Sequence, residues 1–335
     1  MKTVGLPIIF CVLVALSCSL LARESIRVGI IGLDTSHVIA FTEILNDENN
    51  PNHVPGARVV AAVPGGSPDI PASTSHVEGY TKELRERFQV EIVSDISALC
   101  AKVDAVLLES VDGRPHLNQL RPVIAARKPV FIDKPLAGSL KDALEIARLV
   151  KDSGVPCFSA SSLRFFPGVT RLKHDPGVGS ILGCDVQSPC ATEPHHPDLY
   201  WYGVHGVEML FMLMGPGCDS VTRVASDNYD IVVGKWADGR LGTFRGIRKG
   251  AQPFGATVFG EKRVKASDPI DGTLYSHLVR EIVQFFVSGV PPVRMEETVE
   301  TIAFMSAADE SKRRGGVPVK IADVMASPPR ENTPP

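Results

Sequence analysis

Short apolar runs alternate with helical stretches over the first half of the chain, and this alternation most constrains the fold. Residues 26–32, 57–63, 90–93, 103–110, 129–135 and 155–165 have the length and aliphatic character of buried strands. Residues 34–47, 80–88, 96–102, 116–128 and 139–154 carry apolar residues at helical spacing. Strands that alternate with helices in this way predict an α/β domain with a doubly wound parallel sheet over about 25–155.

The second half has longer β-rich segments. They cover 181–189, 220–239, 240–248 and 254–264, with turn signals such as Asp238-Gly239 between them. This pattern predicts a mostly antiparallel sheet, open on one face, in a second α/β domain at 156–325. Two late helices, 276–289 and 296–316, are expected to return toward the first domain. The Pro-rich tail at 326–335 has the composition of a disordered segment.

The N-terminal segment departs from the rest of the chain. Residues 4–22 carry no charge, Lys2 precedes them and Arg23 follows. A positive start, an apolar centre and small residues at the end are typical of a secretory signal peptide, which we assign to 1–22. Cys18 lies in a loose lipobox, so a lipid anchor is one alternative, and an uncleaved membrane anchor is another. We therefore expect an exported protein, periplasmic or extracellular.

Charge and cysteine content exclude little except nucleic acid as a partner. The 35 Lys and Arg residues against 38 Asp and Glu give a net charge of -3, which provides no basic field for phosphate backbones. Five of the seven cysteines follow the leader. Cys184 and Cys190 could form a disulfide in an oxidising compartment, but burial as small apolar residues is the favoured interpretation.

Seven motifs occur in the order found in one enzyme family. They are IRVGIIGLD, VDAVLLES followed by His116, FIDKPLAGSLKDALEIARLVKDSGV, SLRFFPGV, GVHGVEMLFMLMG, EIVQFFVSGVPPV and ESKRRGGVPVKI. In this order the chain resembles the glucose-fructose oxidoreductase, inositol dehydrogenase and MocA (Gfo/Idh/MocA) family. The resemblance implies an N-terminal Rossmann domain for NAD or NADP, and a C-terminal α/β domain that supports substrate and homo-oligomer contacts.

Two residues match the proton-transfer groups of the family. Lys134, in an Asp-Lys-Pro sequence, matches the lysine beside nicotinamide and substrate, and a lysine at the carboxyl end of a strand can stabilise an alkoxide. His205 matches the family histidine, and an imidazole can accept a hydroxyl proton near neutral pH. The aspartate expected four residues earlier falls on Trp201, and Asp198 is considered as its replacement. Lys134 and His205 are the predicted catalytic residues.

Other residues near His205 are candidates for substrate contacts. Tyr200, Trp201 and Tyr202 are interpreted as a stacking platform for a sugar ring. The polar candidates are Arg164, His195, His196 and Asp198. The histidines and Asp198 are also residue types that bind metals, but they lack a tight two-ligand spacing, so no metal site is assigned.

The dinucleotide-binding loop departs from its usual pattern. G-x-G-x-x-G aligns with 32–37, where only the first glycine is present. We expect Asp34, at the second glycine, to cap the following helix and to oppose a phosphate there. Ser36 and His37 could compensate as hydrogen-bond donors. The predicted cofactor-binding residues are Gly32, Asp34, Thr35, Ser36, His37, His116 and Lys134.

A second polar group follows the strand predicted at 103–110. Glu109, Asp112, Arg114 and His116 lie on the side of the sheet where ligands bind in doubly wound folds. They either hold a polar ligand or form a solvated loop, and the sequence leaves both open.

Three functions are compatible with these residues. The first is NAD(P)-dependent hydride transfer on a carbohydrate or cyclitol hydroxyl, as the resemblance implies. The second keeps the same pocket for a non-redox lyase, hydrolase or epimerase that uses Lys134 and His205 as acid and base. The third is a non-catalytic sugar-binding protein that uses the aromatic residues 200–202.

Overall fold

The computed structural model describes residues 25–328. The predicted leader and residues 329–335 of the predicted tail lie outside this range. No helix within it combines the length and apolar character that a membrane span requires.

A six-stranded parallel sheet forms the N-terminal part, in the order β3-β2-β1-β4-β5-β6. Its strands are β1 (Ile26–Ile31), β2 (Ala57–Val63), β3 (Glu91–Ile92), β4 (Ala105–Leu108), β5 (Val130–Asp133) and β6 (Cys157–Ala160). Every residue of β4, β5 and β6 is buried, as expected for strands covered on both faces. The predicted doubly wound parallel sheet is therefore confirmed. The expected boundary at 155 falls before β6, so the sheet extends further along the chain.

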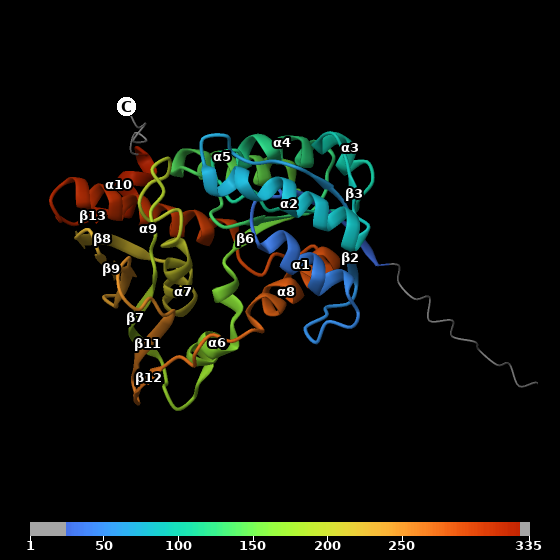
Figure 1. Cartoon of the computed structure of the whole chain (residues 1–335). Coiled ribbons are helices and arrows are strands. Elements are labelled where there is room, and N and C mark those ends of the chain that lie inside the picture. Colours follow the sequence, from blue (N-terminus) through green and yellow to red (C-terminus); the bar gives the residue numbers. More distant parts are fainter. Residues whose placement is uncertain (1–24, 329–335) are drawn as a thin grey trace, which may run out of the picture.

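Helices cover both faces of this sheet (Figure 1). They are α1 (His37–Asn46), α2 (Pro71–Phe88), α3 (Ile96–Cys100), α4 (His116–Ala125) and α5 (Leu140–Ser153). Local signals fix the ends of α5, because the Ser139 side chain accepts a hydrogen bond from the Asp142 N–H at 3.0 Å and Gly154 adopts a left-handed conformation.

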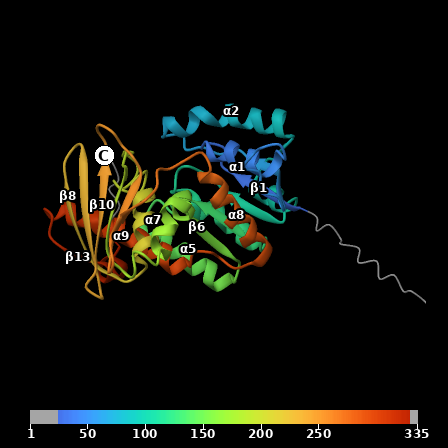
Figure 2. The ribbon, with the colours of Figure 1, turned by 90° about the horizontal axis from the view of Figure 1, so that it is seen from below.

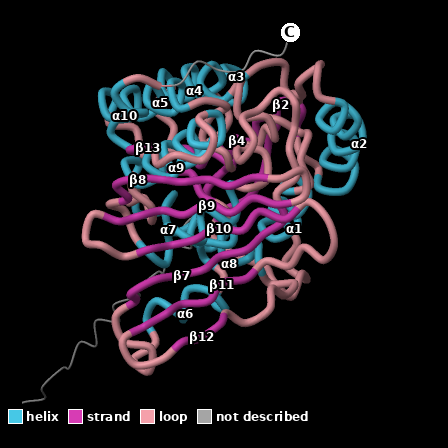
Figure 3. The backbone as a smooth tube through the Cα atoms, turned by 90° about the vertical axis from the view of Figure 1, so that its left-hand side faces the viewer, coloured by secondary structure: helices cyan, strands magenta, loops and turns pink. Residues whose placement is uncertain are grey.

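A seven-stranded sheet dominates the C-terminal part, in the order β12-β11-β7-β10-β9-β8-β13. Its strands are β7 (Ile181–Pro189), β8 (Cys218–Ala225), β9 (Tyr229–Trp236), β10 (Leu241–Ile247), β11 (Gly255–Gly260), β12 (Val264–Ala266) and β13 (Val319–Lys320). Only β7 and β10 pair in parallel, so the mostly antiparallel prediction is confirmed. One face of the sheet lacks covering helices (Figure 3).

The remaining helices connect the two sheets. They are the 3₁₀ helix η1 (Ser162–Phe165), α6 (Pro167–His174), α7 (Val204–Met214), α8 (Leu274–Ser288), α9 (Met295–Arg313) and α10 (Ile321–Ala326). Helices α7 and α9 lie between the sheets (Figure 2), and every residue of α7 is buried. Helix α8 packs on α1, so the late helices return to the first domain as predicted.

The five cysteines in the described part of the chain are free and buried, Cys184 and Cys190 among them. Burial as small apolar side chains is therefore the interpretation that the structure supports, and the alternative of a Cys184–Cys190 disulfide is not present.

Candidate functional site

Two cavities lie at the carboxyl ends of β1, β4 and β5, where doubly wound sheets bind their ligands. The first, which we call the Lys134 cavity, has a volume of about 220 Å³. It is lined by Thr35, Ser36, His37, Val111, Lys134, Ser162, Leu163, Trp201, Tyr202, His205, Phe254, Leu274 and Tyr275. Seven of the predicted site residues therefore meet here, from the loop before α1, the end of β5, and the start of α7 with the loop before it.

Lys134 directly follows β5 and is 7% exposed. Its backbone N–H donates to Asp133 Oδ1 at 2.8 Å, which fixes the chain where the strand ends. Within residues 25–328 its ammonium group forms no ion pair. The group is therefore available to a ligand oxygen in the cavity.

His205 lies in the first turn of α7, and its Nδ1 is 2.7 Å from Ser161 Oγ. Burial, and then the positive charge of Lys134, hold the pKa of this imidazole well below its usual range. The ring is consequently neutral near pH 7 and can accept a proton. Ser161 orients the ring where the family pattern has an aspartate, a role that the sequence did not reveal.

Asp198 does not take the place of that aspartate. Its Oδ2 accepts from Arg223 at 2.9 Å and from Lys312 at 2.6 Å, and it does not line the Lys134 cavity. The expectation that Asp198 orients His205 is wrong, because two cations on β8 and α9 hold its carboxylate elsewhere.

The aromatic wall differs from the predicted platform. The ring of Tyr202 packs edge-on against His205 with centroids 5.0 Å apart, and Phe254 stacks on Tyr202 at 6.4 Å. Tyr200 is instead buried below the surface, with its hydroxyl 2.6 Å from Ser306 Oγ on α9. The wall therefore consists of Trp201 and Tyr202, together with residues from distant segments that the sequence did not single out.

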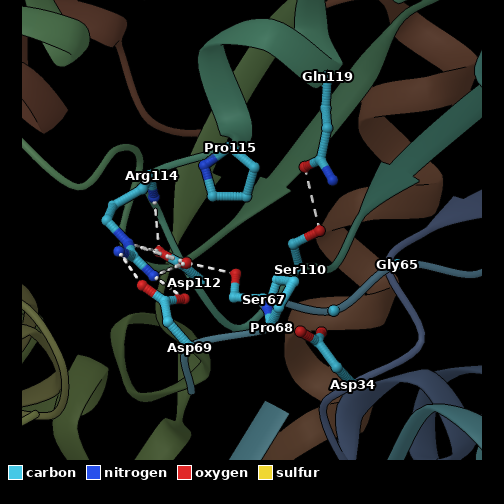
Figure 4. Close-up of a pocket in the computed structure, with 11 residues that line it drawn as sticks. Asp34, Gly65, Ser67, Pro68, Asp69, Ser110, Asp112, Arg114, Pro115 and Gln119 are labelled. Carbon is cyan, nitrogen blue, oxygen red and sulfur yellow. Dashed lines mark hydrogen bonds and ion pairs between the residues drawn. The ribbon is translucent and has the colours of Figure 1, made fainter. Parts of the chain in front are cut away.

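The second cavity, which we call the Arg114 cavity, has a volume of about 400 Å³. It is lined by Asp34, Gly65, Gly66, Ser67, Pro68, Asp69, Ser110, Asp112, Arg114, Pro115 and Gln119 (Figure 4). Arg114 forms a forked contact with Asp69, at 2.8 Å for both pairs of atoms, and also contacts Asp112. The Arg114 contacts hold the pKa of Asp69 below its usual value. The cavity is thus lined by three carboxylates, of Asp34, Asp69 and Asp112, and by one arginine. Two of these carboxylates, Asp69 and Asp112, already bind the arginine.

Asp34 lines the Arg114 cavity but not the Lys134 cavity. Its Oδ1 accepts the Val111 N–H at 2.9 Å and its Oδ2 accepts the Ser73 hydroxyl at 2.6 Å, so the carboxylate ties the loop after β1 to the loop after β4 and to α2. Helix α1 begins only at His37, with Ser36 at its N-cap and no capping side-chain bond. The expectation that Asp34 caps this helix is wrong, because its side chain bonds to Val111 and Ser73 instead.

Five other predicted residues do not line the Lys134 cavity. Gly32 has a positive φ, and its N–H donates to the Val63 carbonyl oxygen at 3.1 Å. Arg164 is buried between Glu208 and Glu297, each 2.6 Å away. The two ring nitrogens of His116 lie 2.9 and 3.2 Å from the carbonyl oxygens of Ser110 and Leu136. Arg164 thus links η1 to α7 and α9, and His116 links α4 to the loops that follow β4 and β5.

The last two, His195 and His196, lie beside the Arg114 cavity. Both contact Glu193, and His196 Nε2 lies 3.0 Å from Asp112 Oδ1. The metal-binding residue types noted at 195–205 are therefore spread over three different sets of partners.

Comparison with known proteins identifies the first domain. Residues 26–161 match the family model GFO_IDH_MocA, described as an oxidoreductase family with an NAD-binding Rossmann fold. The first domain is therefore similar to the Rossmann domain of Gfo/Idh/MocA proteins, over about two fifths of the chain. The Gfo/Idh/MocA proteins are NAD-dependent oxidoreductases, and some members are non-redox enzymes such as a hydratase.

The individual proteins similar to this chain include a hydratase and dehydrogenases. The chain is 31% identical over 100 residues to the 2,7-anhydro-N-acetylneuraminate hydratase of Escherichia coli (strain K12), a match over 28% of this chain and 27% of that relative. The structure of a probable dehydrogenase from Thermotoga maritima superposes with a TM-score of 0.74 at 21% identity, over 89% of this chain and 99% of that one. The myo-inositol dehydrogenase of Lactobacillus casei, solved with NAD(H) and myo-inositol, gives 0.70 at 16% identity, over 88% and 96%. These structures show a shared fold.

The described conformation does not fit a dinucleotide bound in the usual Rossmann position. A dinucleotide crosses the sheet at its switch point with its diphosphate at the N-terminus of the first helix. Here Asp34 takes the place of the second glycine of the loop, and its carboxylate accepts the Val111 N–H at 2.9 Å, which joins the loops that follow β1 and β4. The Asp34 carboxylate would also lie next to a diphosphate and repel it.

Proposed function

We propose that this protein is a non-redox enzyme that acts on a carbohydrate or cyclitol in the Lys134 cavity, by elimination or addition of water or an alcohol. The observation that carries the proposal is the meeting of Lys134 and a neutral His205 in one cavity, while Asp34 replaces the second glycine of the dinucleotide loop and accepts the Val111 N–H. The hydratase relative supports this class, because its named reaction is not a net oxidation.

The two groups suit proton abstraction next to a carbonyl. His205 would accept the proton from the carbon beside a substrate carbonyl, while the Lys134 ammonium group stabilises the negative charge that moves onto the carbonyl oxygen. Expulsion of a hydroxyl or alkoxyl group from the next carbon completes the elimination, and His205 returns its proton to the leaving oxygen. Each step conserves protons and electrons, so no external oxidant is required.

The walls suit a polyol ring. Tyr202 and Phe254 offer flat apolar faces on one side, and Tyr275 lies edge-on to His37 on another. Sugar rings present C–H faces to aromatic side chains and hydroxyl groups to polar ones, which Ser36 and Ser162 provide here.

Solvent deuterium exchange tests the proposal without knowledge of the final product. The mature chain, freed of small molecules, is incubated in D₂O with oxidised sugars that carry a carbonyl, and deuterium uptake is followed by NMR. We expect uptake that is lost in Lys134→Ala and in His205→Asn, and kept in the exposed control variants Lys82→Ala and His76→Asn. Uptake that both active-site variants retain would refute the assignment, and binding without any uptake would favour a sugar-binding protein.

Hydride transfer is the second candidate, because the family model that matches residues 26–161 is that of an NAD-binding domain. NAD or NADP would then bind after Asp34 releases Val111. The same incubation with either cofactor separates the two, since a redox enzyme changes absorbance at the nicotinamide band and the proposed one does not.

The uncovered face of the C-terminal sheet supports the expected homo-oligomer. Six exposed apolar residues lie on six of its strands: Leu182, Val224, Tyr229, Leu241, Phe259 and Val264. A patch of this kind favours association with another protein surface. Light scattering after gel filtration tests it, with Leu241→Lys expected to shift the mass toward the monomer.

We also propose that the protein acts outside the cytosol, which detection in a periplasmic or culture fraction would test.

A further inference from the structure

Three buried side chains lie close together, and one of them, His37, also lines the Lys134 cavity. Glu109 follows β4, Asp133 ends β5 and His37 opens α1. One ligand atom of each lies within 4.8 Å of those of the other two. Glu109 is fully buried, while Asp133 and His37 are 1% and 7% exposed. The topology of the sheet thus brings two carboxylates and one imidazole to a single enclosed point.

The contacts of Asp133 leave one of its oxygens at the centre of this cluster. Its Oδ1 accepts the Lys134 backbone N–H, whereas its Oδ2 lies 2.7 Å from His37 Nδ1. Two atoms this close suit adjacent positions in a metal coordination shell, in which each would be about 2.0–2.2 Å from the ion.

Glu109 is the observation that requires explanation. Both of its carboxylate oxygens are buried and neither has a hydrogen-bond partner within the described residues. Its backbone N–H donates to Ile31 O at 2.8 Å, so the residue is fixed beside β1. An enclosed carboxylate without a partner is costly unless a cation or a proton neutralises it.

The protein's own cations do not supply this neutralisation by contact. Lys134 is near enough to act electrostatically on Glu109, but no ion pair joins them within the described structure. Asp34 adds a third carboxylate nearby, which its two hydrogen bonds hold in place. Among the described residues, Glu109 thus has the carboxylates of Asp133 and Asp34 nearby as well as the one lysine.

We propose that His37, Glu109 and Asp133 bind one divalent first-row transition-metal ion, such as Zn²⁺ or Mn²⁺. An imidazole with two carboxylates suits these ions, whereas Ca²⁺ and Mg²⁺ favour sites made of oxygen alone. Three protein ligands leave coordination positions open, as in catalytic metal sites. Because His37 also lines the Lys134 cavity, an ion here would lie next to a ligand in that cavity. The inference goes beyond the proposed function, since metal binding is measured without substrate.

Calorimetry with ZnCl₂ or MnCl₂ alone tests the site. The whole mature chain is treated with a chelator, dialysed and titrated, and metal content as purified is measured by mass spectrometry. We expect one ion per chain, and an affinity reduced by at least about 100-fold in Glu109→Gln, which removes a ligand but keeps the side-chain volume. Replacement by Co²⁺ should give a visible absorption band in the wild type that this variant lacks.

Two further variants make the result decisive. His37→Asn provides an independent ligand change if Glu109→Gln does not fold. Glu193→Gln is the matched control, because Glu193 contacts His195 and His196 in the other cluster of acids and histidines. The proposal is overturned if the wild type binds neither ion more tightly than roughly 10 μM, or if Glu109→Gln binds as the wild type does, in which case Glu109 carries a proton. Loss of binding in Glu193→Gln would move the site to the Arg114 cavity.

Discussion

Replacement of Arg164 separates a structural role from a substrate contact. The guanidinium is 6% exposed, and its Nε and Nη1 atoms each lie 2.6 Å from a carboxylate oxygen, of Glu208 and Glu297 respectively. Burial raises the pKa of Glu208, which indicates that its environment disfavours an unpaired charge. Removal of one partner from a buried ion pair costs about 3–5 kcal/mol, because the other charge is left without compensation.

We therefore expect Arg164→Met to lower the free energy of unfolding by about 4 kcal/mol and the Tm by roughly 8 °C or more. Thermal and urea unfolding followed by circular dichroism measure both quantities. The double variant Arg164→Met, Glu208→Gln should recover part of the loss, because it removes one uncompensated carboxylate. Arg148→Met, which breaks only exposed ion pairs, is the control and should change stability by less than about 1 kcal/mol. Unchanged stability of Arg164→Met together with lost sugar binding would refute this reasoning and restore the substrate role predicted from the sequence.

Two further predictions concern the backbone near the site and its pH dependence. Gly32→Ala should destabilise the fold more than Gly154→Ala, because both positions have a positive φ but only a Cβ at 32 would meet Ser110 Oγ, at 2.3 Å; equal losses in urea unfolding would contradict this. Since the pKa of buried His205 is lowered, the unfolded chain binds a proton that the folded chain does not, so stability should fall as the pH drops below about 6.5, by up to about 1.4 kcal/mol per unit. His205→Gln should show a shallower slope between pH 7 and 5, and an unchanged slope would exclude His205 as its source.

The order of strands and helices was predictable because buried parallel strands are continuous apolar runs. The run at 57–63 coincides with β2, and the Ser-Leu-Lys-Asp start and Gly154 mark the ends of α5. Helix α2 begins at Pro71, before the predicted 80, because its first turns are mostly exposed and carry no apolar periodicity.

The site was predictable only where neighbouring residues share one loop. Thr35, Ser36 and His37 meet the Lys134 cavity together, but consecutive residues can also diverge, as Tyr200 does from Trp201. The partner of Asp34 on α2, Ser73, is 39 residues away in the sequence, so no local pattern could indicate where the Asp34 carboxylate is held.

The central claim is that Asp34, in place of the second glycine of the loop, opposes a dinucleotide there, so that the Lys134 cavity works without a nicotinamide cofactor. Native mass spectrometry of the mature chain with NAD⁺, NADH, NADP⁺ and NADPH tests it most directly, with Asp34→Gly as the matched variant. We predict no cofactor adduct for the wild type and an adduct for Asp34→Gly, which restores the second glycine of the loop. One dinucleotide bound per wild-type chain would contradict the account and establish the nicotinamide-dependent reaction of the family in its place.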